Sequence, residues 1–526
     1  MASKFPSWLH SHVLDKWKAT RFYERIGEYD LFYIDLAKGI FSTLTTSTLM
    51  PLIVPEASEH DLADFAVWIA AWYEDFINEA GLWKAFTDRH QAVSGRALPF
   101  WDLDDYDAEY LNWQDMAMLL WTWERKVKSK KFSDPMSAAI RLQATVLTAM
   151  LESTIDIAPA STDWDDFLQL KPTDGFKEMR GKLMWIGLKS YLYGQLDFVG
   201  RDAEIQQKLR KEAVGQSEPY LKNVGYDIKL EVLFNFVTQF GGERLPVMAS
   251  RILRGEPEVL ASVAACSEKV LGTFWLEGSD AECHYLKEKE SGRTFRVVRE
   301  SANLKAENGR IVQTSLIKWR GDFWIGGVST QDFGIAPKSK PEASLPLTLG
   351  TDEEVAEILE MLEVEYQCFI SKFGGPLKFC ASRSEAEDAL QEFYSELEAV
   401  LARKKGREPE EVNIPKLTDY PVNESIAIFY SKGSGILISA DAGYVIDFLG
   451  REPQGPSEIK SAFMSLFLEC NYPMVHTIAQ NYSLTPLQIP GFQFEVAPNV
   501  PALCWFMNPS GAGAPKPNMG IAVNGE

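Results

Sequence analysis

The spacing of apolar residues changes twice along this chain, and this change constrains the fold more than any other feature. From the N-terminus to about residue 257, apolar side chains recur every three or four positions, as in 62–76, which is typical of helices that bury one face. Between residues 270 and 328 the pattern becomes short runs rich in β-branched and aromatic residues, separated by turn sequences such as Ser291-Gly292. Beyond residue 350 the helical spacing returns. Two patterns of this kind predict several domains of different class.

We predict a multidomain α+β architecture for the 526 residues. A large, mainly helical N-terminal domain is expected over 1–258, and a small all-β, barrel-like module over 259–336. A linker and a helical hairpin follow over 337–416, and a small α/β domain with a Gly- and Pro-rich tail covers 417–526. Strands are expected at 270–276, 282–286, 294–298, 311–319 and 323–328 in the module, and at 425–430, 435–439 and 444–449 in the last domain.

Charge and cysteine content narrow the function classes. The chain has 53 basic and 74 acidic residues, a formal charge of -21, which repels nucleic acid and anionic lipid at long range. Salt screens this repulsion beyond about one Debye length of ~8 Å, so binding of RNA or phosphate at a local basic patch is still compatible with the net charge. The six cysteines are scattered singly without zinc-type spacing, and the apolar region 31–54 is interrupted by Asp35 and Lys38. We expect a cytoplasmic protein with no cofactor and no membrane partner, and the cysteines and histidines give no metal ligands.

The densest local charge lies in the stretch 102–109, which we call the acidic loop. Its carboxylates belong to Asp102, Asp104, Asp105, Asp107 and Glu109. A solvated loop entering a helix N-terminus, a docking surface for a basic partner and a metal site all fit this composition. An EF-hand does not fit, because the positions that need glycine and glutamate hold Asp107 and Trp113. A metal-dependent site would need further carboxylates from distant parts of the chain.

A second candidate surface lies near the end of the predicted β module. It combines aromatic rings with cations at Lys318, Trp319, Arg320 and Trp324. Single-stranded nucleic acids are bound by such combinations. Alternation along a strand sends neighbouring side chains to opposite faces, so at least one of the two tryptophans is expected to fill the core of the module.

No catalytic constellation appears in the sequence. The histidines are isolated or terminal, and Gly433-Ser434-Gly435 fits a hairpin turn and matches neither a nucleophile elbow nor a phosphate-binding loop. The basic run 125–131 is explained by its place at the end of the helix predicted from Asn112, where cations are favourable. Catalytic residues therefore stay unassigned.

Three motifs carry a resemblance to a known family. They are Leu98-Pro99-Phe100-Trp101-Asp102, then Asn112-Trp113-Gln114-Asp115 followed by Leu119-Leu120-Trp121, and the strand-like segment 315–324. Together they resemble an uncharacterised family of bacterial proteins with a domain of unknown function. The resemblance implies a bacterial cytoplasmic protein and transfers no catalytic residue.

The mosaic of domains without a catalytic constellation favours an interaction or regulatory protein without chemistry of its own. Its expected partner is another protein. The first alternative is a metal-dependent enzyme that acts on a phosphoester or nucleic acid through the acidic loop. The second is an RNA-associated protein that uses the β module.

Overall fold

The computed structural model describes residues 6–128, 132–198, 233–289, 292–301, 311–326, 330–331, 352–414, 416–431 and 435–508. Two compact units emerge. Unit 1 comprises Met1–Ser267 and Gly491–Ala502, and unit 2 comprises Glu268–Pro490 and Leu503–Glu526. The predicted linker before residue 352 and the Gly- and Pro-rich tail after residue 508 lie outside the described residues.

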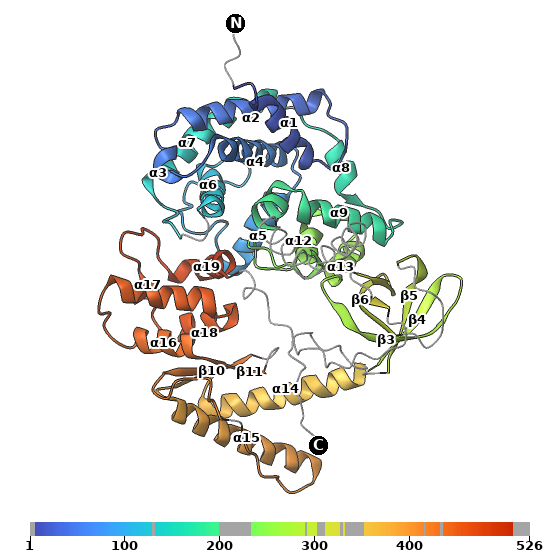
Figure 1. The fold of residues 1–526 in the computed structure, drawn as a ribbon, viewed down its shortest axis with the longest axis vertical. Coiled ribbons are helices and arrows are strands. Elements are labelled where there is room, and N and C mark those ends of the chain that lie inside the picture. The colour runs from blue at the N-terminus through green and yellow to red at the C-terminus, as the bar shows by residue number, and fades with distance from the viewer. Residues whose placement is uncertain are drawn as a thin grey trace, which may run out of the picture. The chain divides into compact units, whose positions relative to one another are not determined.

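Unit 1 is built from helices, as its apolar spacing predicts (Figure 1). They are α1 (Leu9–Ala19), α2 (Glu28–Thr46), α3 (Met50–Ile53), α4 (Glu59–Ile77), α5 (Leu82–Ser94), α6 (Trp113–Val127), α7 (Ala138–Glu152), α8 (Asp163–Leu168), α9 (Phe176–Leu188), the π-helix η2 (Tyr191–Phe198), α12 (Leu245–Ile252) and α13 (Pro257–Ala265). The short strands β1 (Gln169–Leu170) and β2 (Arg254–Gly255) pair in parallel. None of the helices within the described residues is long and apolar enough to cross a bilayer.

Helix α4 lies at the centre of unit 1 and packs against both α1 and α2. It begins at Ser58, whose hydroxyl accepts a hydrogen bond from the Asp61 amide, and the Asp61 carboxylate accepts one from the Ser58 amide. This reciprocal capping box is the device that the sequence favours at this position. Its apolar face is buried through Phe65, Ile69 and Trp72.

The first part of unit 2 is the β module. Its strands are β3 (Lys269–Ser279), β4 (Cys283–Glu288), β5 (Thr294–Val298), β6 (Ile311–Trp319), β7 (Asp322–Ile325) and β8 (Thr330–Gln331). The predicted strands of this region are confirmed to within a few residues, apart from 327–329, which lie outside the described residues. The sheet order is β3-β4-β5-β7-β6-β8, and β3 also pairs with β6. Phe274, Leu286, Phe295 and Leu316 form its apolar core.

The rest of unit 2 combines helices with a three-stranded antiparallel sheet. Its elements are α14 (Asp352–Phe373), β9 (Leu377–Cys380), α15 (Arg383–Lys405), β10 (Ile426–Ser431), β11 (Gly435–Ser439), α16 (Ala440–Leu449), α17 (Pro456–Met464), the π-helix η4 (Ser465–Glu469) and α18 (Tyr472–Asn481). Helix α19 (Val500–Met507) spans the boundary of the two units. The strand expected at 444–449 is wrong, because this segment belongs to α16.

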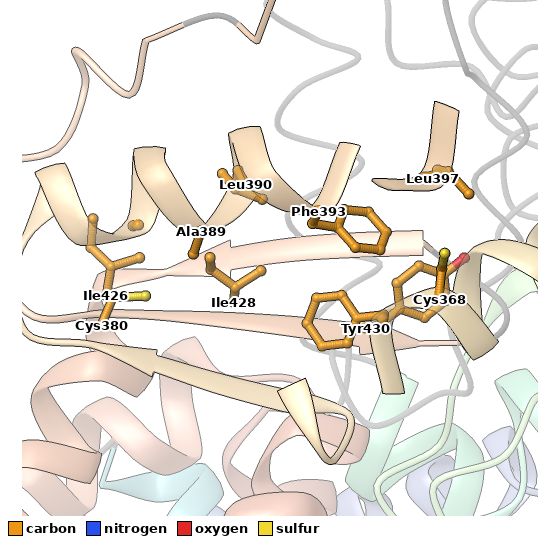
Figure 2. Close-up of a cluster of buried hydrophobic side chains, with 11 residues drawn as sticks. Cys368, Cys380, Ala389, Leu390, Phe393, Leu397, Ile426, Ile428 and Tyr430 are labelled. Atoms are coloured by element: carbon orange, nitrogen blue, oxygen red, sulfur yellow. The ribbon is translucent and has the colours of Figure 1, made fainter. Parts of the chain in front are cut away.

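Strand β10 is the centre of this sheet and is buried on both faces. On one face Ile426, Ile428 and Tyr430 belong to one buried cluster with side chains of α15, among them Leu390 and Phe393 (Figure 2). Helix α16 contacts the same strand. Strand β9, which lies between the two helices of the predicted hairpin, pairs with β10 and so brings the hairpin into the sheet.

Candidate functional site

The acidic loop borders a surface pocket of about 440 Å³ in unit 1. The pocket is lined by Trp101, Asp102, Asp104, Asp105, Trp113, Gln114, Met136, Ala138, Arg141 and Gln493. All five carboxylates of the loop are exposed, but only those of Asp102, Asp104 and Asp105 belong to the lining. The structure therefore brings three of the five candidates to one cavity and leaves Asp107 and Glu109 outside its lining.

The conformation of the loop is set by the residue that precedes α6. Asn112 occupies the N-cap position of α6, but its side chain makes no capping bond to the helix backbone and turns back to the loop. Its Nδ2 donates to the carbonyl oxygens of Asp107 and Tyr110, both at 2.8 Å, and its Oδ1 accepts from the Asp107 amide at 3.2 Å. A buried amide with these partners holds the exposed carboxylates in a fixed turn.

A buried carboxylate connects the acidic loop to the core of unit 1 through hydrogen bonds. Asp115 of α6 accepts hydrogen bonds from Trp83 Nε1 at 2.7 Å, Tyr106 Oη at 3.1 Å and Asn112 Nδ2 at 3.3 Å. Burial raises the pKa of Asp115 to about 6 against these hydrogen bonds, which lower it. Because Tyr106 lies within the loop, the loop and the core of unit 1 share one hydrogen-bonded cluster.

The same tryptophan reaches a second buried carboxylate. The Trp83 amide donates to Asp75 Oδ2 at 2.8 Å, and Tyr191 Oη of the π-helix donates to the same oxygen at 2.8 Å. Burial also raises the pKa of Asp75 to about 6. Both carboxylates are therefore interior hydrogen-bond acceptors, and neither lines the pocket.

Aromatic and cationic groups complete the lining of the pocket. The Arg141 guanidinium of α7 lies 4.9 Å from the ring centroid of Trp113, within the range of a cation–π contact. Gln114 Nε2 lies 3.4 Å from the Asp102 carbonyl oxygen. Trp101 is 1% exposed, and its indole Nε1 has no hydrogen-bond partner among the described residues.

One wall of the pocket comes from a distant part of the sequence. The Gln493 amide donates to Asp134 Oδ2 at 3.2 Å, and the Phe100 amide donates to Asn499 Oδ1 at 2.6 Å. The rings of Phe100 and Phe494 lie 5.2 Å apart in an edge-to-face contact. Sequence analysis did not place this segment near the acidic loop, and no local pattern in it indicates the contact.

Metal ligation was left open for the acidic loop. Within the described residues, no group of three or more His, Cys, Asp or Glu side chains is arranged to hold an ion. In particular, Asp102 uses one carboxylate oxygen to accept the Asp104 amide at 3.2 Å, and Asp107 accepts the Glu109 amide at 3.0 Å. These local turns orient the carboxylates along the loop.

The candidate surface of the β module divides between core and solvent. Trp319 is 4% exposed and its ring is covered by the Arg320 guanidinium at 4.8 Å. Trp324 is half-buried, whereas Lys318 and Arg320 are exposed. At least one tryptophan is buried, as strand alternation predicts, so these residues do not offer two open ring faces to a ligand.

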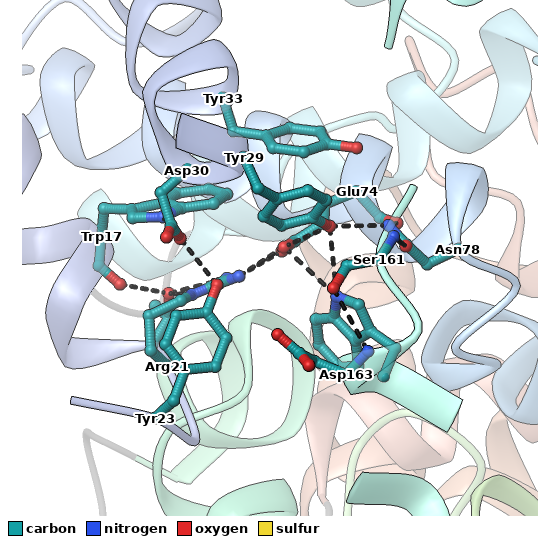
Figure 3. A network of polar contacts seen from close by, with 12 residues as sticks. Trp17, Arg21, Tyr23, Tyr29, Asp30, Tyr33, Glu74, Asn78, Ser161 and Asp163 are labelled. Carbon is teal, nitrogen blue, oxygen red and sulfur yellow. Dashed lines mark hydrogen bonds and ion pairs between the residues drawn. The ribbon is translucent and has the colours of Figure 1, made fainter. Parts of the chain in front are cut away.

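A buried ion pair in unit 1 was not found by sequence analysis. Arg21 and Glu74 are 2% and 0% exposed, and Arg21 Nη1 lies 2.5 Å from both Glu74 carboxylate oxygens (Figure 3). Tyr29 Oη donates to Glu74 at 2.9 Å, and the Trp17 ring lies 3.9 Å from the guanidinium. The pair is enclosed by its partners and lines neither the pocket at the acidic loop nor the pocket around Asp441 and Tyr444, so we assign it a structural role.

Comparison with known proteins identifies a domain in the first part of the chain. Neither the curated proteins nor the solved structures contain a significant match. Residues 13–233 match the model of a family described as "Protein of unknown function (DUF3843)". This range includes the acidic loop, α6 and α7, but not Gln493 or the motif at 315–324. The predicted resemblance is confirmed in this sense: over residues 13–233 the chain is similar to the DUF3843 family, whose function is unknown.

Proposed function

We propose that the protein is an interaction protein whose acidic pocket receives a basic side chain of a partner protein. One observation carries the proposal: three exposed carboxylates and the Trp113 ring line one cavity. Carboxylates attract a guanidinium or ammonium group, and an indole face adds a cation–π contact. The ligand class is a basic peptide segment.

The electrostatics of the whole chain support a cationic partner. The formal charge of -21 attracts basic proteins over the range of screening and speeds their encounter.

Binding without catalysis is the simplest function for these groups. Among the described residues that line the pocket, none is a serine, cysteine, histidine or lysine, so the pocket contains no Ser–His or Cys–His pair of nucleophile and base. The carboxylates offer charge and hydrogen-bond acceptors. We therefore propose a docking surface, in a protein that has no reaction of its own.

The proposal is tested by fluorescence anisotropy of a labelled arginine-rich peptide with the full chain. The double variant Asp104→Asn/Asp105→Asn should weaken binding about three- to tenfold, because each exposed ion pair is worth up to about 1 kcal/mol. The matched control, Glu24→Gln/Glu56→Gln, removes the same charge from exposed residues outside both the lining and the acidic loop and should bind like the wild type. Equal binding by both doubles would refute the proposal.

We propose a cytoplasmic location. All six cysteines are buried and free, which suits a reducing compartment. Fractionation of the native cell tests this, and recovery of the protein in the secreted fraction would contradict it.

A second candidate function uses the β module. We propose that its strands close into a barrel, because the pairings run β3-β4-β5-β7-β6 and return to β3, with β5 and β7 parallel. A five-stranded barrel of this type is used by many oligonucleotide- and oligosaccharide-binding domains. The exposed cations near it are partly neutralised, since Arg296 pairs with Asp322 at 2.8 Å. Gel-shift assays with single-stranded RNA test it, and loss of binding in Lys318→Gln/Arg320→Gln would favour this function.

A further inference from the structure

We infer that Arg141 is a resident cation of the acidic pocket and that a partner's arginine displaces it. The inference rests on the proposed function and adds a residue that sets its affinity. Arg141 lines the same cavity as the three carboxylates, and its guanidinium lies 4.9 Å from the centroid of Trp113. In the free protein, one guanidinium therefore already occupies the ring face that an incoming arginine would use.

The contacts of Arg141 are weak enough to be exchanged. Its side chain is exposed and makes no ion pair with any residue in the described part of the chain. The cation–π contact with Trp113 is the interaction that the structure gives to this side chain. This differs from Arg21, whose Nη1 contacts both oxygens of a buried carboxylate, and from Arg296, which forms ion pairs with Glu282 and Asp322. An exposed cation–π contact is small, so a ligand can replace it.

Arg141 of α7 competes with an incoming arginine for the pocket. A second guanidinium entering the pocket gains the carboxylates of Asp102, Asp104 and Asp105 but meets the like charge of Arg141. It also competes for the face of Trp113. The resident side chain therefore lowers the affinity for a basic segment and must turn outward, into solvent, when the segment binds.

The inference predicts that removal of Arg141 strengthens binding. In anisotropy titrations with the arginine-rich peptide, Arg141→Gln should bind about two- to fivefold more tightly than the wild type, the size expected for loss of one exposed cation–π competitor. Arg141→Lys keeps the charge and should bind like the wild type. Arg25→Gln is the control, because it removes the same charge from an exposed residue outside the lining.

Each outcome decides between the inference and the function on which it rests. The inference is supported if Arg141→Gln binds the peptide more tightly than the wild type while Arg141→Lys and Arg25→Gln do not. This holds also if binding by the wild type is too weak to measure. If Asp104→Asn/Asp105→Asn loses binding but Arg141→Gln binds equally or more weakly, the inference is overturned and the pocket remains the site. If the wild type and all variants fail to bind, both are overturned. Circular dichroism of each variant excludes loss of folding as the cause.

Discussion

At the scale of single residues, unit 1 depends on charged groups that are removed from water. The Arg21–Glu74 pair is buried, with one guanidinium nitrogen in contact with both carboxylate oxygens, and Tyr29 and Trp17 pack around it. Removing one member of such a pair leaves the other charge buried without its counter-ion. We predict that Glu74→Gln lowers the free energy of unfolding of unit 1 by about 3–5 kcal/mol in urea titrations of the full chain. The coupling follows from the single variants Arg21→Met and Glu74→Met and the double variant Arg21→Met/Glu74→Met. If the double variant loses more unfolding free energy than the two single variants together, the pair does not stabilise the fold.

Asp115 gives a prediction on pH dependence. Because burial raises its folded-state pKa to about 6, above the unfolded value of ~3.9, the stability from the protonated group is complete below about pH 4 and is lost as the pH rises through about 6. Asp115→Asn keeps an acceptor for Trp83 and Tyr106 but cannot ionise. Relative to the wild type, this variant should gain up to about 1.4 kcal/mol per pH unit between pH 4 and 6 in urea unfolding. If the difference in unfolding free energy between Asp115→Asn and the wild type is constant from pH 4 to 6, the pKa of Asp115 is not raised by burial.

At the scale of elements, the β module tests how far strand alternation predicts burial. Trp319 is at the end of β6 and is 4% exposed, whereas Trp324 of β7 is half-buried. Loss of a buried tryptophan costs about 3–5 kcal/mol. Trp319→Ala should therefore lower the melting temperature of the module more than Trp324→Ala, measured by near-ultraviolet circular dichroism. The opposite order would show that Trp324 is the core residue.

Alanine substitutions at two helical glycines distinguish the effect of close packing on stability from the effect of helix propensity. A Cβ on Gly443 of α16 would meet the backbone of Ser425 and Ile426, whereas a Cβ on Gly181 of α9 would meet nothing within 4 Å. Gly181→Ala should stabilise unit 1 by about 0.5–1 kcal/mol through helix propensity. Gly443→Ala should destabilise unit 2, because α16 can no longer approach β10. Thermal unfolding measures both, and stabilisation by Gly443→Ala would contradict the close approach.

At the scale of the whole molecule, sequence analysis could predict what depends on local patterns. Apolar period and turn sequences located most helices and the strands of the β module, because burial of one face imposes a fixed spacing. The prediction of a strand at 444–449 is wrong because an apolar run of this length fits a buried helix as well as a strand. The helix begins after Ser439, whose hydroxyl accepts a hydrogen bond from the Ala442 amide.

The candidate site was predictable only in part. The density of carboxylates located the acidic loop, but the pocket depends on Arg141 and Gln493, which are distant in sequence. The buried Arg21–Glu74 pair is likewise formed by residues from two segments, and neither segment has a pattern that indicates it. Contacts of this kind arise from tertiary packing, which a single sequence does not encode in its local spacing.

The most direct test of the acidic pocket is hydrogen–deuterium exchange of the full chain with and without the arginine-rich peptide. We predict slower exchange in 101–114 and 136–141, where the loop, the start of α6 and the start of α7 line the pocket. Exchange in the β module should be unchanged. Protection confined to the β module, or no protection of 101–114 under saturating peptide, would contradict a basic-peptide site in the acidic pocket.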